Sequence, residues 1–361
     1  MNEHLEHLRQ SIDACDRELV TILNKRSEVA AEIGRIKAEK GGTIYDPSRE
    51  EIVYEKVSGL NQGPLSNAAL RAIYREIISS AKALEGPTRI AFLGPEATYT
   101  NQAALAIFGA SMHYTPVGSI PEIFTLVEKG SADYGVLPIE NSTDGIVRHS
   151  LDMLVNTKLF IVNQVYLDIE HCLISNSPLS EIRVVCSKDQ ALGQCRDWLL
   201  RYLPDALQKE VESTSLAVKM AMGEPGVAAI ASALASEKWG VPIVERNIQD
   251  RSDNITRFLV IGKDPAKRLG AGKDRTSIVV SLNDEVGALQ EALNIFSRHG
   301  INLCKIESRP TRRKSWDYFF FIDFIGHFED TDVQSALEQL RGKSNFVKWL
   351  GSYPNTQMRS L

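Results

Sequence analysis

An arginine set among apolar residues is the first feature of this chain that suggests chemistry. Apolar side chains recur at alternating steps of three and four at Leu5, Leu8, Ile12, Cys15, Leu19, Ile22, Val29, Ile33 and Ile36. This spacing is typical of a heptad seam, and Arg26 occupies the seam position between Ile22 and Val29. A guanidinium in an apolar contact is costly unless it meets an anion. Arg26 therefore requires either a carboxylate of another helix or an anionic ligand, and the spacing leaves both open.

Other charged side chains are placed to join Arg26. Lys37 follows eleven residues later, about 20° away on a helical wheel at ~100° per residue, so both project toward one side of the helix. Asp46, Arg49 and Glu50 share one face of the next helix. An aspartate before a proline is also a good N-cap, and the other two fit ordinary surface charge equally well. The pattern indicates a basic anion site with carboxylates nearby.

Arg9 reaches such a site only from a second chain. It stands 17 residues before Arg26, ~25 Å along a helix axis, which is too far to share one small ligand. The helix predicted from about residue 4 to Lys40 would be roughly 55 Å long. A rod of that length must bury its seam against other helices or another chain. If Arg9 also serves the site, an antiparallel partner chain must supply it.

Polar residues also gather at predicted element ends in the middle of the chain. The clusters are Thr98-Tyr99-Thr100, Glu140-Asn141-Ser142, Ser187 with Gln190 and Gln194, Ser213-Thr214-Ser215, and Asn254-Ile255-Thr256-Arg257-Phe258. Any one of them fits a helix cap. Together they are able to line a cleft that binds carboxylates through hydroxyls, backbone N–H groups and Arg257. His171 with Cys172, at the end of an apolar run, fits a core position better than a catalytic pair.

Three stretches with different periodicities must position these residues. Residues 1–87 carry only helical patterning, with further helices beginning at Asp46-Pro47 and at Ser66. Residues 88–264 alternate strand-like and helix-like segments, which indicates a layered α/β domain. After the linker-like run KDPAKRLGAGKD, residues 274–355 read strand, helix, strand, strand, helix, strand. This order is the ferredoxin-like α+β arrangement, more typical of a binding or regulatory module.

Composition excludes several classes of protein. At roughly 150 residues per domain, 361 residues predict two or three domains. Forty-one basic and 46 acidic residues give a net charge of −5 without a basic tail, so nucleic acid and membrane surfaces are not expected partners. The N-terminus lacks a secretory pattern, and no apolar run approaches the ~20 residues of a membrane span. We expect a cytoplasmic protein.

Cofactor chemistry finds no support in the sequence. The five cysteines are scattered, form no CxxC pair, and lie at Cys15, Cys172, Cys186, Cys195 and Cys304. This pattern argues against a disulfide framework and a structural zinc site. The middle domain carries no metal-ligand spacing, phosphate loop or Gly-x-Ser-x-Gly elbow. We expect neither a metal nor an organic cofactor.

The run LRQSIDACDRELVTILNKRSEVAAEIGRIKAEK, followed by DPSRE, resembles the all-helical chorismate mutase family. The resemblance implies an intertwined homodimer that binds dianionic chorismate between basic side chains and rearranges it to prephenate. This pericyclic reaction requires no nucleophile, so catalysis consists of holding the compact conformer and stabilising charge on the ether oxygen. The resemblance implies that Arg9 of the partner, Arg26 and Lys37 hold the two carboxylates and the ether oxygen. It implies that Arg49 supports them. It implies that Asp46 and Glu50 meet the region of the ring hydroxyl.

Two positions depart from that family's pattern. A family serine falls on Ala81, and a family glutamine that donates to the ether oxygen falls on Glu85. A carboxylate has no proton to donate, so Glu85 would have to be protonated. Its place in the last turn of a helix and in a buried pocket favours the neutral form. We expect a mutase that loses activity as the pH rises.

The segments GPEATYT, GVLPIENSTDG, HCL, STS and NITRF resemble prephenate dehydratase over residues 89–262. The resemblance implies two lobes like those of periplasmic binding proteins, with the site between them. The reaction removes carbon dioxide and the ring hydroxide from prephenate and gives phenylpyruvate. By position, the resemblance implies that Thr256 donates to the leaving hydroxyl and that Arg257 anchors a carboxylate. The other implied substrate contacts are Asn141, Ser187 and Gln194.

The motifs GALQEAL and ESRP resemble the ACT regulatory domain that accompanies this dehydratase. The resemblance implies phenylalanine binding at a domain interface by Gly287, Ala288, Leu289, Asn302, Leu303, Glu307 and Ser308. Gly287 permits close backbone approach at a helix N-terminus, which suits a carboxylate, and Glu307 is able to meet an ammonium group.

Taken together, the resemblances imply a bifunctional chorismate mutase–prephenate dehydratase, at least dimeric, with phenylalanine as a feedback inhibitor. The expected fold is an all-α intertwined dimer domain, a two-lobed α/β domain and a ferredoxin-like ACT domain. A second hypothesis is a non-catalytic amino-acid sensor, in which the N-terminal helices serve only to form a dimer. A third hypothesis is a dehydratase whose mutase domain has decayed. The departures from the mutase pattern at Ala81 and Glu85 support it.

Overall fold

The computed structural model describes residues 2–39, 44–310 and 318–356. Two compact units divide the chain. One consists of Met1–Asp46, Val53–Thr88 and Phe108–His113, and the other of Pro47–Ile52, Arg89–Ile107 and Tyr114–Leu361. The first unit is helical, and the second holds three β-sheets with their helices.

Three helices form the N-terminal part, as predicted: α1 (Asn2–Glu39), α2 (Pro47–Leu60) and α3 (Asn67–Glu85). The starts of the second and third follow local chemistry. Proline fits the first position of α2 because its missing N–H has no intrahelical acceptor there. The Ser66 hydroxyl accepts the Ala69 N–H at 3.1 Å and caps α3. Helix α3 packs against α1.

The apolar seam of α1 is open along most of its length. Its large members are between 46% and 62% exposed, and they are Leu5, Leu8, Ile12, Leu19, Ile22, Val29, Ile33 and Ile36. Within the part of the chain that the structure describes, about half of each of these side chains is left exposed. Large exposed apolar stripes mark interaction surfaces in folded proteins.

The first lobe of the α/β region is built on one mixed sheet in the order β2-β1-β3-β11-β5, with β4 beside β3. The strands are β1 (Arg89–Leu93), β2 (His113–Val117), β3 (Tyr134–Asn141), β4 (Gly145–Ile146), β5 (Phe160–Asp168) and β11 (Ile255–Gly262). The helices are α4 (Tyr99–Phe108), α5 (Ile120–Lys129) and α6 (Arg148–Asn156). Strand β11 enters this sheet between β3 and β5, antiparallel to both.

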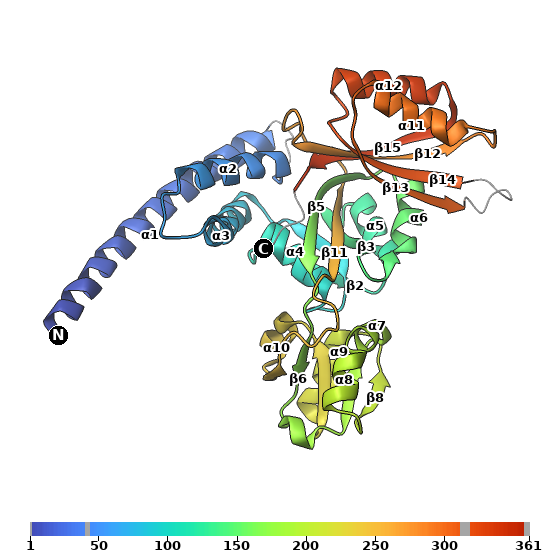
Figure 1. The fold of residues 1–361 in the computed structure, drawn as a ribbon. Helices are drawn as coiled ribbons and strands as arrows, with labels where there is room; N and C mark the ends of the chain where they lie inside the picture. The colour runs from blue at the N-terminus through green and yellow to red at the C-terminus, as the bar shows by residue number, and fades with distance from the viewer. Residues whose placement is uncertain (1, 40–43, 311–317, 357–361) are drawn as a thin grey trace. The chain divides into compact units, whose positions relative to one another are not determined.

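The second lobe has its own sheet, in the order β10-β6-β9-β7-β8. Its strands are β6 (Cys172–Ile174), β7 (Val184–Ser187), β8 (Leu207–Glu210), β9 (Val227–Ala231) and β10 (Ile243–Glu245). Its helices are α7 (Asp189–Gln194), α8 (Arg196–Tyr202), α9 (Thr214–Gly223) and α10 (Ala233–Trp239), with a short 3₁₀ turn at Leu179–Glu181. Figure 1 shows this lobe in green and yellow.

The chain crosses between the two lobes twice, after β5 and before β11, and the two crossings are hydrogen-bonded together. The Ile169 N–H donates to the Asn254 carbonyl at 2.8 Å, and the Ile248 N–H donates to the His171 carbonyl at 2.9 Å. The His171 N–H donates to the Gln249 side chain at 2.9 Å. The predicted two-lobed architecture is confirmed, and residues of both crossings lie close together.

The C-terminal domain has the predicted βαββαβ order. Its elements are β12 (Asp274–Leu282), α11 (Ala288–Arg298), β13 (Leu303–Pro310), β14 (Tyr318–Ile325), α12 (Thr331–Arg341) and β15 (Ser344–Pro354). The sheet runs β13-β14-β12-β15, and α11 and α12 cover one face (Figure 1). The other face shares a core with the first lobe, where Val279, Phe321 and Leu350 join Leu154 and Ile161. Both faces of this sheet are therefore occupied.

Candidate functional site

Arg26 has no anionic partner in the described part of the chain. Its side chain is half-buried on α1, and it makes no ion pair or hydrogen bond with a described residue. The nearby α1 carboxylate of Glu32 pairs with Arg35 at 2.9 Å. The internal ion pair that was the alternative reading of Arg26 is absent from these residues, which leaves the guanidinium available to an anion.

Glu85 approaches α1 where a glycine makes room for it. A Cβ atom at Gly34 would lie 2.5 Å from the Glu85 Cγ atom, so only glycine permits this contact. The Glu85 Oε2 atom is buried and has no hydrogen-bond partner among the described residues. Burial raises the pKa of the Glu85 carboxyl, and the charges of Lys37 and Lys82 partly offset this. The packing of α3 on α1 thus brings Lys37 and a carboxyl that favours its neutral form together.

The other residues predicted for this site lie on three different segments. Arg9 is exposed on α1 and pairs with Glu6 at 3.6 Å, one turn away. Asp46 precedes α2, and Arg49 and Glu50 lie in its first turn. These positions match the predicted elements, and the structure does not bring Arg9 to Arg26 within one chain.

Ala81 is buried on α3, and its neighbouring serines do not replace the missing hydroxyl. The Ser79 hydroxyl accepts the Ser111 N–H at 3.1 Å. The Ser80 hydroxyl is exposed and donates to the Ile77 carbonyl at 3.1 Å. The polar contact that the family serine supplies is therefore absent at position 81.

The geometry of Glu85 carries a pH prediction. Below its raised pKa the carboxyl keeps its proton and can donate to an ether oxygen; above that pKa it is ionised and cannot donate. A bound dianion raises this pKa further, because like charges disfavour ionisation. We expect mutase kcat/KM to fall as the pH rises through that pKa, and Glu85→Gln to flatten the profile. Glu32→Gln, which removes an exposed α1 carboxylate, is the control and should keep the wild-type profile. An unchanged profile in Glu85→Gln would remove Glu85 from the mechanism.

In the α/β region, Thr256 on β11 stands opposite Asn141 on β3. The Asn141 amide has one possible orientation, because its Oδ1 atom accepts the N–H groups of Thr143 at 2.8 Å and Asp144 at 2.9 Å. Its Nδ2 atom therefore donates to the Thr256 hydroxyl oxygen at 2.8 Å. Thr256 accepts this bond and donates to no described residue. Its hydroxyl proton is left to point at another molecule.

A chain of oriented amides continues from Asn141. The second Nδ2 hydrogen of Asn141 is donated to Asn254 Oδ1 at 2.7 Å, and Asn254 Nδ2 donates to Gln194 Oε1 at 2.9 Å. Gln194 Nε2 donates to the Asp144 carboxylate at 2.7 Å. Since Gln194 Oε1 is an acceptor, His171 Nε2, 2.8 Å away, must carry a proton. The chain joins both lobes and the crossings between them.

His171 is 2% exposed, and burial lowers its pKa, with Gln194 and Asp144 acting in the opposite direction. The Tyr99 hydroxyl donates its one proton to the Glu170 carbonyl at 2.8 Å and lies 2.8 Å from His171 Nδ1. His171 is a buried residue, as its apolar flank predicts, yet it belongs to the polar chain that ends at Thr256.

Other members of the predicted polar clusters serve the fold. Ser187 is fully buried, and its hydroxyl donates to the Ile230 carbonyl at 2.7 Å. The Ser213 hydroxyl caps α9 by accepting the Leu216 N–H, and Ser215 accepts the Trp239 indole N–H at 3.2 Å. Ser187 therefore has no free proton for a ligand, although its oxygen is still able to accept.

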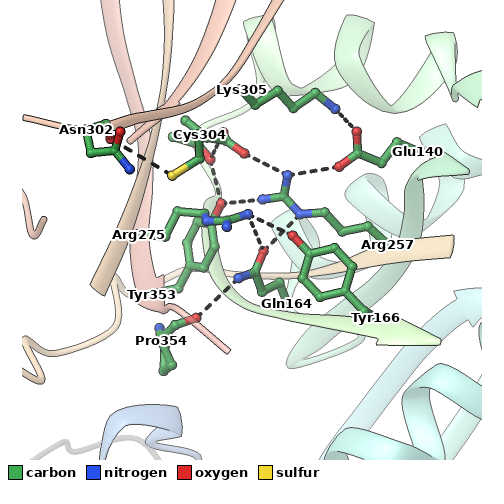
Figure 2. A network of polar contacts seen from close by, with 12 residues as sticks. Glu140, Gln164, Tyr166, Arg257, Arg275, Asn302, Cys304, Lys305, Tyr353 and Pro354 are labelled. Atoms are coloured by element: carbon green, nitrogen blue, oxygen red, sulfur yellow. Dashed lines mark hydrogen bonds and ion pairs between the residues drawn. The ribbon is translucent and has the colours of Figure 1, made fainter. Parts of the chain in front are cut away.

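Arg257 lies on the opposite face of β11 from Thr256, 3% exposed. All three of its side-chain nitrogens donate to protein oxygens, which belong to Glu140, Gln164, Asp323 and Tyr353 (Figure 2). This differs from the predicted carboxylate anchor. Successive residues of a strand point to opposite faces, so the Arg257 side chain is turned toward these protein acceptors and away from Thr256.

The C-terminal residues divide in a similar way. Gly287 has φ of +86°, which favours glycine, and α11 begins at the next residue. Ser308 pairs with Phe320, which packs with the α11–α12 core, whereas Glu307 pairs with Phe321 in the core shared with the first lobe. Glu307 thus faces away from Ser308 and the α11 start, which differs from their predicted shared role. The sequence signal for this difference is that successive residues of a strand alternate between its two faces, which is missed when ESRP is treated as a single motif.

The described ranges contain neither a cluster of metal-binding side chains nor a helix suited to span a membrane. No group of three or more histidine, cysteine, aspartate or glutamate side chains there could hold a metal ion. None of the helices in these ranges combines the length and the apolar composition that crossing a bilayer requires.

Comparison with known proteins gives matches along the whole chain. Family models match as chorismate mutase type II over residues 8–86, prephenate dehydratase over 90–266 and the ACT domain over 276–342. The chain is 44% identical to the bifunctional chorismate mutase/prephenate dehydratase of Aquifex aeolicus, covering 99% of each protein. It is 41% identical to that of Neisseria gonorrhoeae, covering 96% of each. The crystal structure of prephenate dehydratase from Arthrobacter aurescens in complex with L-Phe is similar, with a TM-score of 0.70 and 32% identity, over 76% of this chain and 92% of that one.

Proposed function

This chain belongs to the bifunctional chorismate mutase/prephenate dehydratase family, and we propose how its residues carry out the two reactions. The helical part rearranges chorismate to prephenate. The two-lobed part converts prephenate to phenylpyruvate, and phenylalanine acts through the ACT domain. One observation carries the dehydratase assignment: Asn141 holds the oxygen of Thr256, whose proton has no protein acceptor among the described residues.

For the mutase, Arg26 and Lys37 bind the carboxylates of chorismate, and protonated Glu85 donates to the ether oxygen. Arg49 supports them, and Asp46 and Glu50 meet the ring hydroxyl. The open seam of α1 favours a homodimer or larger homo-oligomer, since a second copy of the same stripe is its natural cover. An antiparallel partner then places its Arg9 at the site.

For the dehydratase, the carboxylate on the ring leaves as carbon dioxide, and its bonding electrons enter the ring. The ring hydroxyl departs with its electron pair, takes up one proton and leaves as water. Thr256 donates a hydrogen bond to that oxygen as negative charge develops. A threonine hydroxyl is a weak acid, so we assign it hydrogen-bond donation or proton relay. Asn141 orients Thr256, and Gln194 joins the site from the second lobe.

Two of the residues predicted for these sites receive other roles. Arg257 is committed to protein acceptors on the far face of β11, and we propose no substrate contact for it. Ser187 contributes at most an acceptor oxygen. Phenylalanine binds at the start of α11 and around β13, in our proposal through Gly287, Ala288, Leu289, Asn302, Leu303 and Ser308. Glu307, on the other face of the sheet, is left out of that set.

Separate incubations of the purified protein with chorismate and with prephenate, each with and without phenylalanine, test these assignments. Prephenate and phenylpyruvate are followed separately. We expect both to form, and phenylalanine to slow phenylpyruvate formation so that prephenate accumulates. Failure to consume chorismate or prephenate would support a sensor without catalysis. Turnover of prephenate without turnover of chorismate would indicate a decayed mutase. We propose that both reactions take place in the cytoplasm.

A further inference from the structure

Two residue pairs on β3 and β11 face opposite ways. Thr256 is registered with Asn141, and Arg257 with Glu140. The first pair belongs to the amide chain at the proposed dehydratase site. The second pair consists of Arg257, one residue after Thr256, and Glu140, one residue before Asn141. An ion pair of 3.2 Å joins these two residues on the side of the ACT sheet. Whatever holds Arg257 and Glu140 therefore also holds the backbone of Thr256 and Asn141.

Residues of β13, β14 and β15 contact this second pair directly, and a residue of β12 supports two of them; Figure 2 labels Lys305 and Tyr353 beside Arg257 and Glu140. From β14, Asp323 Oδ2 accepts from Arg257 Nη1 at 2.7 Å. From β15, the Tyr353 hydroxyl accepts from Arg257 Nη2 at 2.8 Å. From β13, Lys305 contacts the Glu140 carboxylate. The fourth strand, β12, acts through Ser277, which donates to Asp323 Oδ1 at 2.5 Å and lies 2.6 Å from the Tyr353 hydroxyl.

Burial makes this network strong. Asp323 is 7% exposed, and Tyr353 is fully buried. The Arg257 charge lowers the pKa of Asp323 against the opposing effect of burial, so the pair is ionised. Without the Asp323 charge, Arg257 keeps one anionic partner, Glu140, which Lys305 also contacts. Loss of one of two carboxylate partners in a poorly solvated place draws the guanidinium toward the other, and we expect the strand that carries it to shift as well.

A further set of polar contacts between the ACT domain and the first lobe lies on helix α6, apart from those that Arg275 makes with Gln164 and Tyr166 of β5. Arg309 pairs with Asp152 at 2.5 Å, and Lys348 donates to the carbonyls of Leu154 and Val155 at the end of that helix. These contacts hold the domains together without touching β3 or β11. They provide a control that separates general adhesion between the domains from an effect on Thr256.

We propose that Asp323, although it lies in the ACT domain, is a positioning residue for the dehydratase reaction. Through Arg257 it fixes the backbone of β11 beside Thr256, and so it sets where the Thr256 hydroxyl meets the leaving group. The inference rests on the proposed role of Thr256. Because misplacement of a reacting group by about 1 Å costs about 10²-fold in rate, a partial shift is expected to lower kcat by about 10-fold or more.

The test compares Asp323→Asn with Asp152→Asn in the full-length protein. Dehydratase kcat and KM are measured with prephenate, and mutase turnover is measured with chorismate in the same preparation. Asp323→Asn should lower dehydratase kcat by at least about 10-fold, change KM by less than about 3-fold, and leave mutase turnover unchanged. Asp152→Asn should leave dehydratase kcat within about 2-fold of wild type, as expected for a partly exposed ion pair.

Dehydratase kcat within 2-fold of wild type in Asp323→Asn would overturn the proposal, as would an equal loss in Asp152→Asn. If Asp323→Asn does not fold, Tyr353→Phe decides instead, because it removes one acceptor of Arg257 without removing a charge. It should lower kcat by at least about 3-fold, and no change would also overturn the proposal. Thr256→Ala in the same assay keeps the two proposals apart. Its retained turnover refutes the role of Thr256, whereas an inactive Thr256→Ala beside an active Asp323→Asn refutes only the role of Asp323.

Discussion

Replacing Thr256 with alanine should lower dehydratase kcat by about 10²–10³-fold, the usual cost of losing one donor to developing negative charge. The hydroxyl oxygen accepts a hydrogen bond from Asn141, and its proton has no acceptor among the described residues. Without that proton the departing hydroxide has no donor at this position. Phenylpyruvate formation from prephenate measures the loss, and mutase turnover in the same sample should stay at the wild-type value.

Two further variants at this position separate the effect of the hydroxyl group from the effect of the side chain's branched shape. Thr256→Val keeps the branched side chain, which suits a residue only 8% exposed, and lacks the hydroxyl. Thr256→Ser keeps the hydroxyl. We expect valine to behave like alanine and serine to retain most activity. Substantial dehydratase turnover in Thr256→Val would show that the reaction takes its proton elsewhere.

Replacing Arg26 with alanine should lower mutase kcat/KM by about 10²-fold or more, because it removes a charge-assisted bond to the substrate that strengthens in the transition state. Arg26 meets no anion of the described chain, so its loss leaves no protein carboxylate unpaired there. Stability should therefore change little. Chorismate consumption is the measurement, and dehydratase turnover from added prephenate is the internal control.

A mixture of Arg9→Ala and Arg26→Ala chains tests whether Arg9 acts from the partner. In an antiparallel dimer each site takes Arg9 from one chain and Arg26 from the other. Each variant alone should be nearly inactive. Random mixing makes half of the dimers mixed, and each of these holds one intact site, so about a quarter of wild-type activity should return. No recovery in dimers shown to be mixed would place Arg9 outside the mutase site.

The element order of this protein could be predicted because its local signals agree with its packing. Helix α2 begins at Pro47 and α3 follows the Ser66 cap, as their chemistry requires. The βαββαβ order was equally legible, since its strands and helices differ in period. The long seam of α1 was visible in the spacing of its apolar residues, and it is exposed as a stripe that needs a partner.

The facing of Arg257 could not be predicted in the same way. Strand β11 is buried on both faces, so the alternation of polar and apolar residues that assigns a face is missing. A signal did exist elsewhere. Asp323 interrupts the apolar run FFFIDFIG, and a carboxylate in a buried strand requires a cation. Sequence alone does not say which cation, because the pairing spans 66 residues and two domains.

The members of the amide chain were found only in part, for a related reason. Asn141, Gln194 and Thr256 stood in conspicuous polar clusters, whereas Asp144 sits in a turn and His171 beside an apolar strand. Their bonds join residues 23 to 115 positions apart. Such long-range contacts depend on the folded arrangement of both lobes and leave no local pattern in the sequence.

The side-chain bonds that orient the Thr256 hydroxyl come from one sheet and from the turn that follows its strand β3. The Asn141 amide is locked by two N–H groups of its own turn, and Thr256 sits on the adjoining strand. Hinge motion of the second lobe would break the link to Gln194 but would leave this small assembly intact. The donor is thus aimed when the chain folds, and an arriving substrate finds it already in place without any entropic cost of ordering.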